Sequence, residues 1–167
     1  MAAVRLGFDP IEEAQRQWEA HDLDETAAMA AATSIMRAHQ LVVAAVDATL
    51  RPFELTFARF EVLMLLSFSR NGSLPMAKMS HRLMVHPTSV TNLVDKLEAQ
   101  GFLERRAHAT DRRTTLATIT PTGRRVARRA AKALTDARFG MALDDAELQQ
   151  MTKLVRDFRD ARDDFGE

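Results

Sequence analysis

The sequence has 167 residues, enough for one domain with a helical extension and a hydrophobic core that needs no covalent cross-links. It contains no cysteine, which excludes disulfides, thiolate metal sites and thiol-based redox switches. Its longest apolar runs fall far short of the ~20 residues that a membrane span requires, and its N-terminus lacks a basic-then-apolar signal pattern. We therefore expect a cytoplasmic protein without a membrane segment.

The charge is distributed unevenly, although the formal net charge is zero. Residues 1–50 contain 3 Lys and Arg against 8 Asp and Glu, residues 51–139 contain 16 against 7, and residues 140–167 contain 4 against 8. A basic central block between acidic ends is typical of a nucleic-acid-binding surface carried by a neutralising scaffold. The alternative is that the arginines are only the solvated faces of helices and bind nothing.

The two terminal segments carry apolar stripes at helical spacing. Residues 11–20 form a short amphipathic stretch with the only tryptophan, Trp18, and a long helix is predicted from about Glu25 to Leu50. Near the other end, Asp144 and Glu147 predict a capping box at the start of a helix. The apolar positions are Met29, Ile35, Met36, Val42, Val43, Val46 and Leu50 in the long helix, and Leu148, Met151, Val155, Phe158 and Phe165 near the C-terminus. These stripes predict a dimerisation module, and an intramolecular helical core is the alternative.

The central part begins with two predicted helices. Thr56 is a predicted N-cap for a helix that ends near Gly72. Residues 73–75 are predicted to start the next helix, Met76 to Leu83, with Pro75 in the first turn, where its missing N–H has no intrahelical partner to lose.

A third central helix is predicted over residues 86–100, after a turn at residues 84–85. Gly101 follows as the C′ residue that ends it. Two helices joined by about three residues form a helix-turn-helix, so residues 86–100 are the candidate recognition helix.

After Gly101 the pattern changes from helix to strand. Residues 102–106 and 115–119 are rich in β-forming side chains and are separated by a polar segment, which predicts a β-hairpin. A hairpin in this place is the wing of a winged helix-turn-helix. A further helix is predicted from Thr122 to about Phe139, with its N-terminal signal at Thr120 and Pro121.

Together these elements predict a mainly α fold with a small β-hairpin wing. The winged helix-turn-helix lobe is expected over residues 51–120. Residues 1–50 hold the N-terminal helix and the long helix, and residues 121–167 hold the C-terminal helices. These two segments are expected to form the helical dimerisation module.

Small polar side chains gather in the first turns of the candidate recognition helix. Such side chains can enter a major groove about 12 Å wide and present donors and acceptors to base edges. Val90, Leu93, Val94 and Leu97 are expected on its buried side. The candidate DNA-contacting residues are Thr88, Ser89, Thr91 and Asn92 at base edges and Lys96 at phosphates. The alternative role of threonine and serine here is helix capping.

The wing supplies a second kind of candidate contact. Arg112 and Arg113 lie at the predicted hairpin tip, and a guanidinium on a thin loop can enter the narrow minor groove, where the potential is most negative. Asp111 is expected to orient a neighbouring arginine. Arg105 and Arg106, at the base of the wing, are expected to reach the DNA backbone.

The stretch from residue 50 to residue 123 resembles the MarR (multiple antibiotic resistance regulator) family. The matching features are Leu55 and Thr56, residues 88–98 followed by Gly101 and Phe102, residues 104–106, residues 111–113, and residues 116–120 with Gly123. The resemblance implies a homodimer whose two lobes bind a pseudo-palindromic duplex, with Arg113 as the wing arginine in the minor groove. It also implies repression that a small, often phenolic or anionic, ligand relieves.

The N-terminal extension resembles a subgroup of this family that responds to urate. Trp18, Glu61 and Arg105 match three positions of that subgroup's ligand pocket, but Leu93 stands where the subgroup has an arginine, and Glu61 is longer than the usual aspartate. The lost arginine removes a charge-assisted bond of roughly 1.5–3 kcal/mol. We therefore expect an aromatic or amphipathic weak acid rather than urate, and Trp18 as a plain packing residue is the alternative.

No pattern in the sequence indicates catalysis or a metal. The five histidines have no tight ligand spacing, and there is neither a nucleophile elbow nor a phosphate-cradling glycine loop. We expect a regulator without metal or cofactor, and not an enzyme. The alternative function is a winged-helix protein that acts through protein contacts, or a constitutive DNA binder that senses no ligand.

Overall fold

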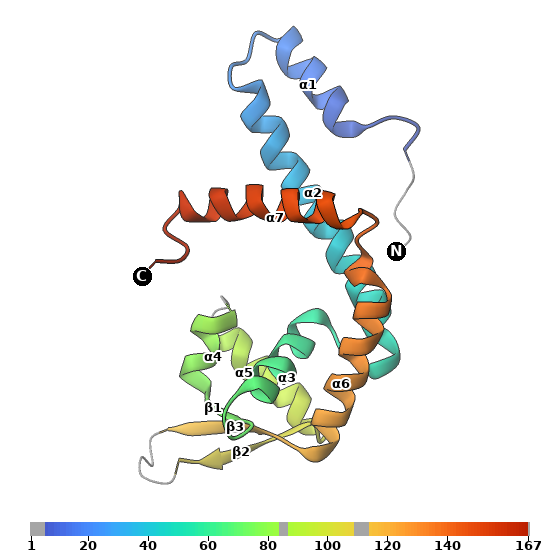
Figure 1. Cartoon of the computed structure of the whole chain (residues 1–167). Coiled ribbons are helices and arrows are strands. Elements are labelled where there is room, and N and C mark those ends of the chain that lie inside the picture. Colours follow the sequence, from blue (N-terminus) through green and yellow to red (C-terminus); the bar gives the residue numbers. More distant parts are fainter. Residues whose placement is uncertain (1–5, 84–86, 109–113, 167) are drawn as a thin grey trace.

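The computed structural model describes residues 6–83, 87–108 and 114–166. The chain forms a winged lobe attached to an extended helical part (Figure 1). The α-helices of the described residues are α1 (Pro10–Ala20), α2 (Thr26–Leu50), α3 (Phe57–Phe68), α4 (Met76–Leu83), α5 (Pro87–Ala99), α6 (Pro121–Asp136) and α7 (Asp145–Asp160). The strands are β1 (Ser73–Pro75), β2 (Leu103–Ala107) and β3 (Thr115–Ile119), and two short 3₁₀ helices are η1 (Arg51–Phe53) and η2 (Arg138–Gly140).

Three helices begin at the capping residues that the sequence predicts. The Thr56 hydroxyl accepts the Arg59 N–H at the start of α3, as a threonine N-cap does. At the start of α7, Asp144 accepts the Glu147 N–H and the Glu147 side chain accepts the Asp144 N–H. This reciprocal pair is the predicted capping box. Thr120 caps α6 by accepting the Gly123 N–H.

The recognition-helix candidate α5 ends at a glycine turn. Gly101 has φ +70°, a left-handed conformation that favours glycine. Its N–H donates to the Glu98 carbonyl at 2.8 Å, and the Phe102 N–H donates to the Leu97 carbonyl at 2.9 Å. This pair of hydrogen bonds is a Schellman motif, and it turns the chain directly from α5 into β2.

The small sheet has the strand order β1-β3-β2, with both pairs antiparallel. The hairpin of β2 and β3 is the predicted wing, with Leu103 opposite Ile119. The predicted helix Met76 to Leu83 is confirmed as α4, but residues 73–75, which were expected to lead into its first turn, form the strand β1 instead. Ser73 pairs with Thr118 on β3, and their hydroxyl oxygens lie 2.9 Å apart. A three-residue strand depends on this distant partner, which local periodicity does not reveal.

One hydrophobic core connects the lobe to its flanking helices. Val46 and Leu50 of α2 are buried in the same cluster as the lobe residues Leu63, Val94 and Leu103. From the other side α6 contributes Ala127, Ala130 and Leu134. The core therefore runs across the boundaries expected at residues 50 and 120, so the lobe cannot turn freely against the ends of α2 and α6.

Helix α6 is shorter than predicted. It ends at Asp136 rather than near Phe139, because Arg138 and Phe139 adopt positive φ angles of 48° and 51° within η2. Gly140 then packs onto α2, where an added Cβ would lie 2.5 Å from the Ala45 Cβ. The resulting turn sends α7 off across α2 (Figure 1).

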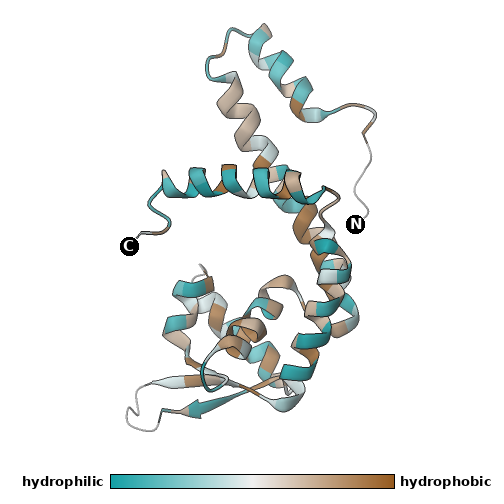
Figure 2. Ribbon diagram, viewed as in Figure 1, coloured by the Kyte–Doolittle hydropathy of each residue, from teal (hydrophilic) through white to brown (hydrophobic). Residues whose placement is uncertain are grey.

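Large apolar side chains remain exposed on α2 and α7. Met36 of α2 is 67% exposed, and Leu154 and Phe158 of α7 are 63% and 52% exposed. Figure 2 shows hydrophobic residues along both helices outside the lobe. By length and composition alone, the segment Thr26–Phe53 would suit a membrane span. However, its C-terminal half is part of the lobe core, so that a bilayer could take up this helix only by disrupting the lobe.

Gly123→Ala is expected to destabilise the lobe. A Cβ at this buried glycine would lie 1.9 Å from the Phe102 carbonyl oxygen, which already accepts the Thr120 N–H at 3.0 Å. The backbone must therefore shift where β2 meets α6, and we expect a loss of roughly 1–3 kcal/mol, measured as a lower Tm in circular dichroism melting. The control is Gly7→Ala, whose Cβ would have no atom within 4 Å. Equal Tm values for the two variants would contradict this account of Gly123.

Candidate nucleic-acid interface

Helix α5 separates its apolar and polar residues cleanly. Val90, Val94 and Leu97 are buried in the lobe core, as expected from the sequence. The polar side chains lie on the exposed side of the same helix. These exposed residues are Thr88, Ser89, Thr91, Asn92 and Lys96. The burial of one side of α5 therefore aims the predicted base-contacting and phosphate-contacting residues away from the protein.

A hydrogen-bonded link holds the C-terminal end of α5. The Gln100 Nε2 donates to the Glu54 carbonyl at 3.0 Å, and the Gln100 Oε1 accepts from the Arg59 guanidinium at 3.3 Å. Glu54 and Arg59 flank the start of α3. The end of the candidate recognition helix is thus tied to the first helix of the lobe.

A second link joins α5 to the base of the wing. The Arg105 N–H on β2 donates to Glu98 Oε1 at 2.9 Å, and the Arg105 guanidinium forms ion pairs with both Glu98 and Asp95. Partial burial disfavours the charged guanidinium, but the hydrogen bonds and charges of Asp95 and Glu98 outweigh it and raise the Arg105 pKa. We call this group of three side chains the Arg105 clamp. It sets the position of the wing base relative to α5.

The wing residues are described only in part. Arg106 is exposed at the end of β2 next to the hairpin and forms an ion pair with Glu104. Asp111, Arg112 and Arg113 lie outside the described residues, as do His86 and the predicted turn at residues 84–85. The described hairpin closes with a hydrogen bond of 3.1 Å from the His108 N–H to the Thr114 carbonyl.

The three candidate ligand residues do not come together within one chain. Trp18 lies on α1, where its indole N–H donates to the Asp24 carbonyl at 2.8 Å. Glu61 lies on α3, and burial raises its pKa. Arg105 lies on β2, at the opposite end of the molecule from α1 (Figure 1). A pocket shared by all three would need residues from two chains.

Sequence reasoning assigned no functional role to two groups of charged residues. The first is Asp95 and Glu98, the partners of Arg105; their spacing of three residues places both on one side of a helix, a usable signal. The second is a set of four arginines on α6 that line a cavity, Arg124, Arg125, Arg128 and Arg129. Within residues 6–83, 87–108 and 114–166, no three His, Asp or Glu side chains form a group that could hold a metal ion.

The arrangement of the lobe defines a class of protein. Helices α4 and α5 form the helix-turn-helix, and the β2-β3 hairpin follows directly. With β1, which precedes α4, the hairpin makes a three-stranded antiparallel sheet. This is a winged helix-turn-helix, whose recognition helix has an exposed polar side and a buried apolar side.

Comparisons with known proteins agree with this class. The model of the MarR family matches residues 55–115. Sco5413, a MarR family transcriptional regulator from Streptomyces coelicolor, is 48% identical and has a TM-score of 0.78, over 84% of this chain and 98% of Sco5413. This chain therefore belongs to the MarR family of transcriptional regulators.

Two more distant relatives are also similar. CouR from Rhodococcus jostii RHA1, whose crystal structure contains bound p-coumaroyl-CoA, is 25% identical with a TM-score of 0.65, over 80% of this chain and 92% of CouR. The uncharacterized HTH-type transcriptional regulator YhbI of Bacillus subtilis (strain 168) is 28% identical over 111 residues, which are 65% of this chain and 71% of YhbI.

Proposed function

We propose that this protein is a homodimeric repressor that binds a pseudo-palindromic DNA site through α5 and the wing. The observation that carries the proposal is the geometry of α5. Its apolar side is packed into the core, and hydrogen bonds join the helix to the segment before α3 and to β2. Its exposed side carries Thr88, Ser89, Thr91, Asn92 and Lys96. Membership of the MarR family supports the same function.

The exposed apolar side chains of α2 and α7 support the homodimer. They border an open cavity of about 570 Å³, lined by residues that include Ile35, Leu154 and Phe158. Apolar patches of this kind on a soluble protein mark contact sites with other chains. A second copy related by two-fold symmetry would cover this surface and place two lobes on half-sites roughly 34 Å apart.

We propose a small aromatic or amphipathic weak acid as the effector. The bound p-coumaroyl-CoA of CouR supports an aromatic ligand. In one chain, the candidate pocket residues Trp18, Glu61 and Arg105 lie apart, so the effector site would form between chains. An anionic effector that reaches Arg105 would compete with Asp95 and Glu98 for its guanidinium. A loosened Arg105 clamp would then lower DNA affinity. The coupling free energy between effector binding and DNA binding would be about 1–3 kcal/mol.

The proposed activity consists of binding alone. DNA and effector bind and leave unchanged, so no catalytic residue, metal or cofactor has a role in it. We place this activity in the cytoplasm, where the DNA of a bacterial cell is accessible to a repressor.

Asn92→Ala is expected to weaken binding to the preferred DNA site by roughly 5–150-fold and to relax base preference at particular positions. The reason is that Asn92 offers hydrogen bonds to base edges from the exposed side of α5. The measurement is fluorescence anisotropy with a site selected from a random duplex library and its single-base variants. Arg113→Ala should instead weaken DNA binding strongly and reduce the slope of log affinity against log salt by about one.

The control for both variants is Lys132→Ala, on the outer side of α6, where Lys132 pairs with Asp136. It should bind DNA like the wild type. Unchanged base preference in Asn92→Ala would contradict the assignment of α5 as the reading helix. Failure of the wild type to bind any duplex at low salt would contradict the proposed function altogether.

A further inference from the structure

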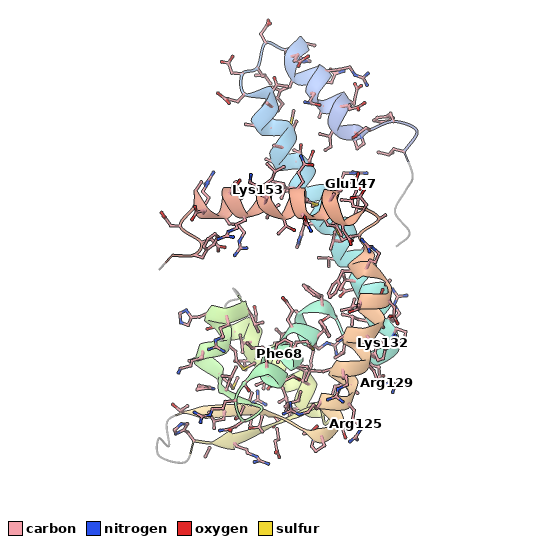
Figure 3. All side chains as sticks on the ribbon, in the orientation of Figure 1. Phe68, Arg125, Arg129, Lys132, Glu147 and Lys153 are labelled. Atoms are coloured by element: carbon pink, nitrogen blue, oxygen red, sulfur yellow. The ribbon has the colours of Figure 1, made fainter. Side chains whose placement is uncertain are left out.

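Four arginines on α6 have no role in the proposed DNA surface. Helix α6 packs mainly against α2 and α3. In Figure 1, α4 and the hairpin ends of β2 and β3 lie on one side of the lobe and α6 lies on the other. Figure 3 labels Arg125, Arg129 and Lys132 along α6 on this second side.

The four arginines share one side of the helix. Because successive residues of an α-helix are about 100° apart, positions 124, 125, 128 and 129 fall within an arc of about 140° over two turns. The buried residues of α6, Ala127, Ala130 and Leu134, lie on the opposite side. All four guanidinium groups therefore extend from the same exposed strip, the arginine strip.

The arginine strip is not neutralised by the protein. Among the described residues, none of its guanidinium groups lies within 4.0 Å of a carboxylate, whereas Lys132, one turn further on the same side, pairs with Asp136 at 2.7 Å. Like charges four residues apart on a helix repel each other. Arg124 and Arg125 also lie close to the positive end of the helix dipole. A bound anion would relieve both unfavourable interactions.

Protein contacts hold three of the four arginine side chains in place. The Arg124 guanidinium donates to the Ser67 carbonyl at 3.3 Å, and the Arg125 guanidinium donates to the Thr122 hydroxyl at 2.9 Å. The Arg129 guanidinium lies 5.7 Å from the centre of the Phe53 ring. These contacts use only part of the five N–H donors of each guanidinium, and they reduce the entropy that binding a ligand would cost.

The strip borders a cavity rather than a flat surface. The cavity has a volume of about 600 Å³ and is lined by the four arginines together with Ile119 and Pro121. Small-molecule sites have volumes of roughly 300–1,000 Å³, so a nucleotide-sized molecule fits. The planar guanidinium binds phosphate oxygens in a bidentate way, and Ile119 and Pro121 offer an apolar surface for a ring.

We propose that this cavity binds a small molecule that carries two or more phosphate groups and a flat ring, such as a nucleoside triphosphate. Four positive charges match the charge of a triphosphate chain. The site is independent of the DNA surface, so this proposal and the proposed function can fail separately.

The test is isothermal titration calorimetry of the full-length chain with adenosine triphosphate and with inorganic triphosphate at low salt. We expect the nucleotide to bind with a Kd below about 100 μM and more tightly than inorganic triphosphate. The double variant Arg125→Ala and Arg128→Ala should bind the nucleotide at least about tenfold more weakly. Lys132→Ala is the matched control on the same side of α6 and should bind like the wild type.

Circular dichroism melting verifies that the double variant is folded. If its Tm is lowered, the measurement is repeated with the double variant Arg125→Gln and Arg128→Gln, whose side chains are polar and longer than alanine. Absence of binding by the wild type at about 1 mM nucleotide would overturn the proposal, as would unchanged binding by the double variant. Equal affinities for the nucleotide and for inorganic triphosphate would exclude a contribution of the ring to binding. Loss of DNA affinity by the double variant, without nucleotide binding to the wild type, would assign the arginine strip to DNA phosphates.

Discussion

Leu154→Asp is expected to convert the protein to a monomer and to abolish tight DNA binding. Leu154 is 63% exposed on α7 and borders the same cavity as Ile35 of α2 and Phe158. A carboxylate at this position would have to lose its water in the proposed dimer contact without gaining a partner, which costs several kcal/mol. A single lobe then binds only one half-site, and the affinity falls by a factor on the order of 10²–10⁴.

Analytical ultracentrifugation and fluorescence anisotropy measure the two effects. The matched control is Gln149→Asp, which introduces the same charge into α7 at an exposed position about 140° around the helix from Leu154. It should remain dimeric and bind DNA like the wild type. A dimeric Leu154→Asp protein would show that the apolar side of α7 is not the contact between chains.

Arg105→Ala is expected to weaken DNA binding by roughly 10–100-fold while the lobe stays folded. Alanine keeps the backbone N–H that donates to Glu98 but loses both ion pairs, so the wing base is held less firmly against α5 and the wing and the helix fit their grooves less well together. The variant also leaves Asp95 and Glu98 without their positive partner next to the proposed DNA surface. Both effects lower affinity, but neither removes a direct contact with a phosphate.

The salt dependence and a double-mutant cycle distinguish this positioning role from a direct contact. Arg105→Ala should leave the slope of log affinity against log salt nearly unchanged, whereas Arg106→Ala should reduce it by about one. In a Glu98→Gln background, Arg105→Ala should have a smaller effect than in the wild type. A reduced salt slope together with an equal effect in both backgrounds would mean that Arg105 itself contacts DNA.

Local signals in the sequence were reliable wherever the interaction spans only a few residues. Thr56, Asp144 and Gly101 cap or end their helices as predicted, because each cap is made with residues no more than four positions away. The faces of α5 were also predicted, since helical periodicity alone separates Val90, Val94 and Leu97 from the polar residues. The wing hairpin joins strands that are close in the chain.

The predictions that failed or missed a contact involve partners that are distant in the chain. Residues 73–75 form a strand only because Thr118 lies beside Ser73, 45 positions later in the chain. The cavity at α6 includes Ile119 beside the four arginines, and Arg124 contacts the Ser67 carbonyl. Sequence spacing does not indicate such contacts, since they depend on how α3, the sheet and α6 pack.

The sequence by itself therefore determined the class of this protein: a winged helix-turn-helix lobe, a basic centre between acidic ends, and the polar side of α5. These properties follow from periodicity, capping and composition, which act over one or two helical turns. Only the tertiary structure decided what the charged residues contact. It paired Arg105 with Asp95 and Glu98, and among the described residues it placed no carboxylate within ion-pair distance of Arg125 or Arg128. The physical reason is that an ion pair depends on distance in space, which the packing of the core sets.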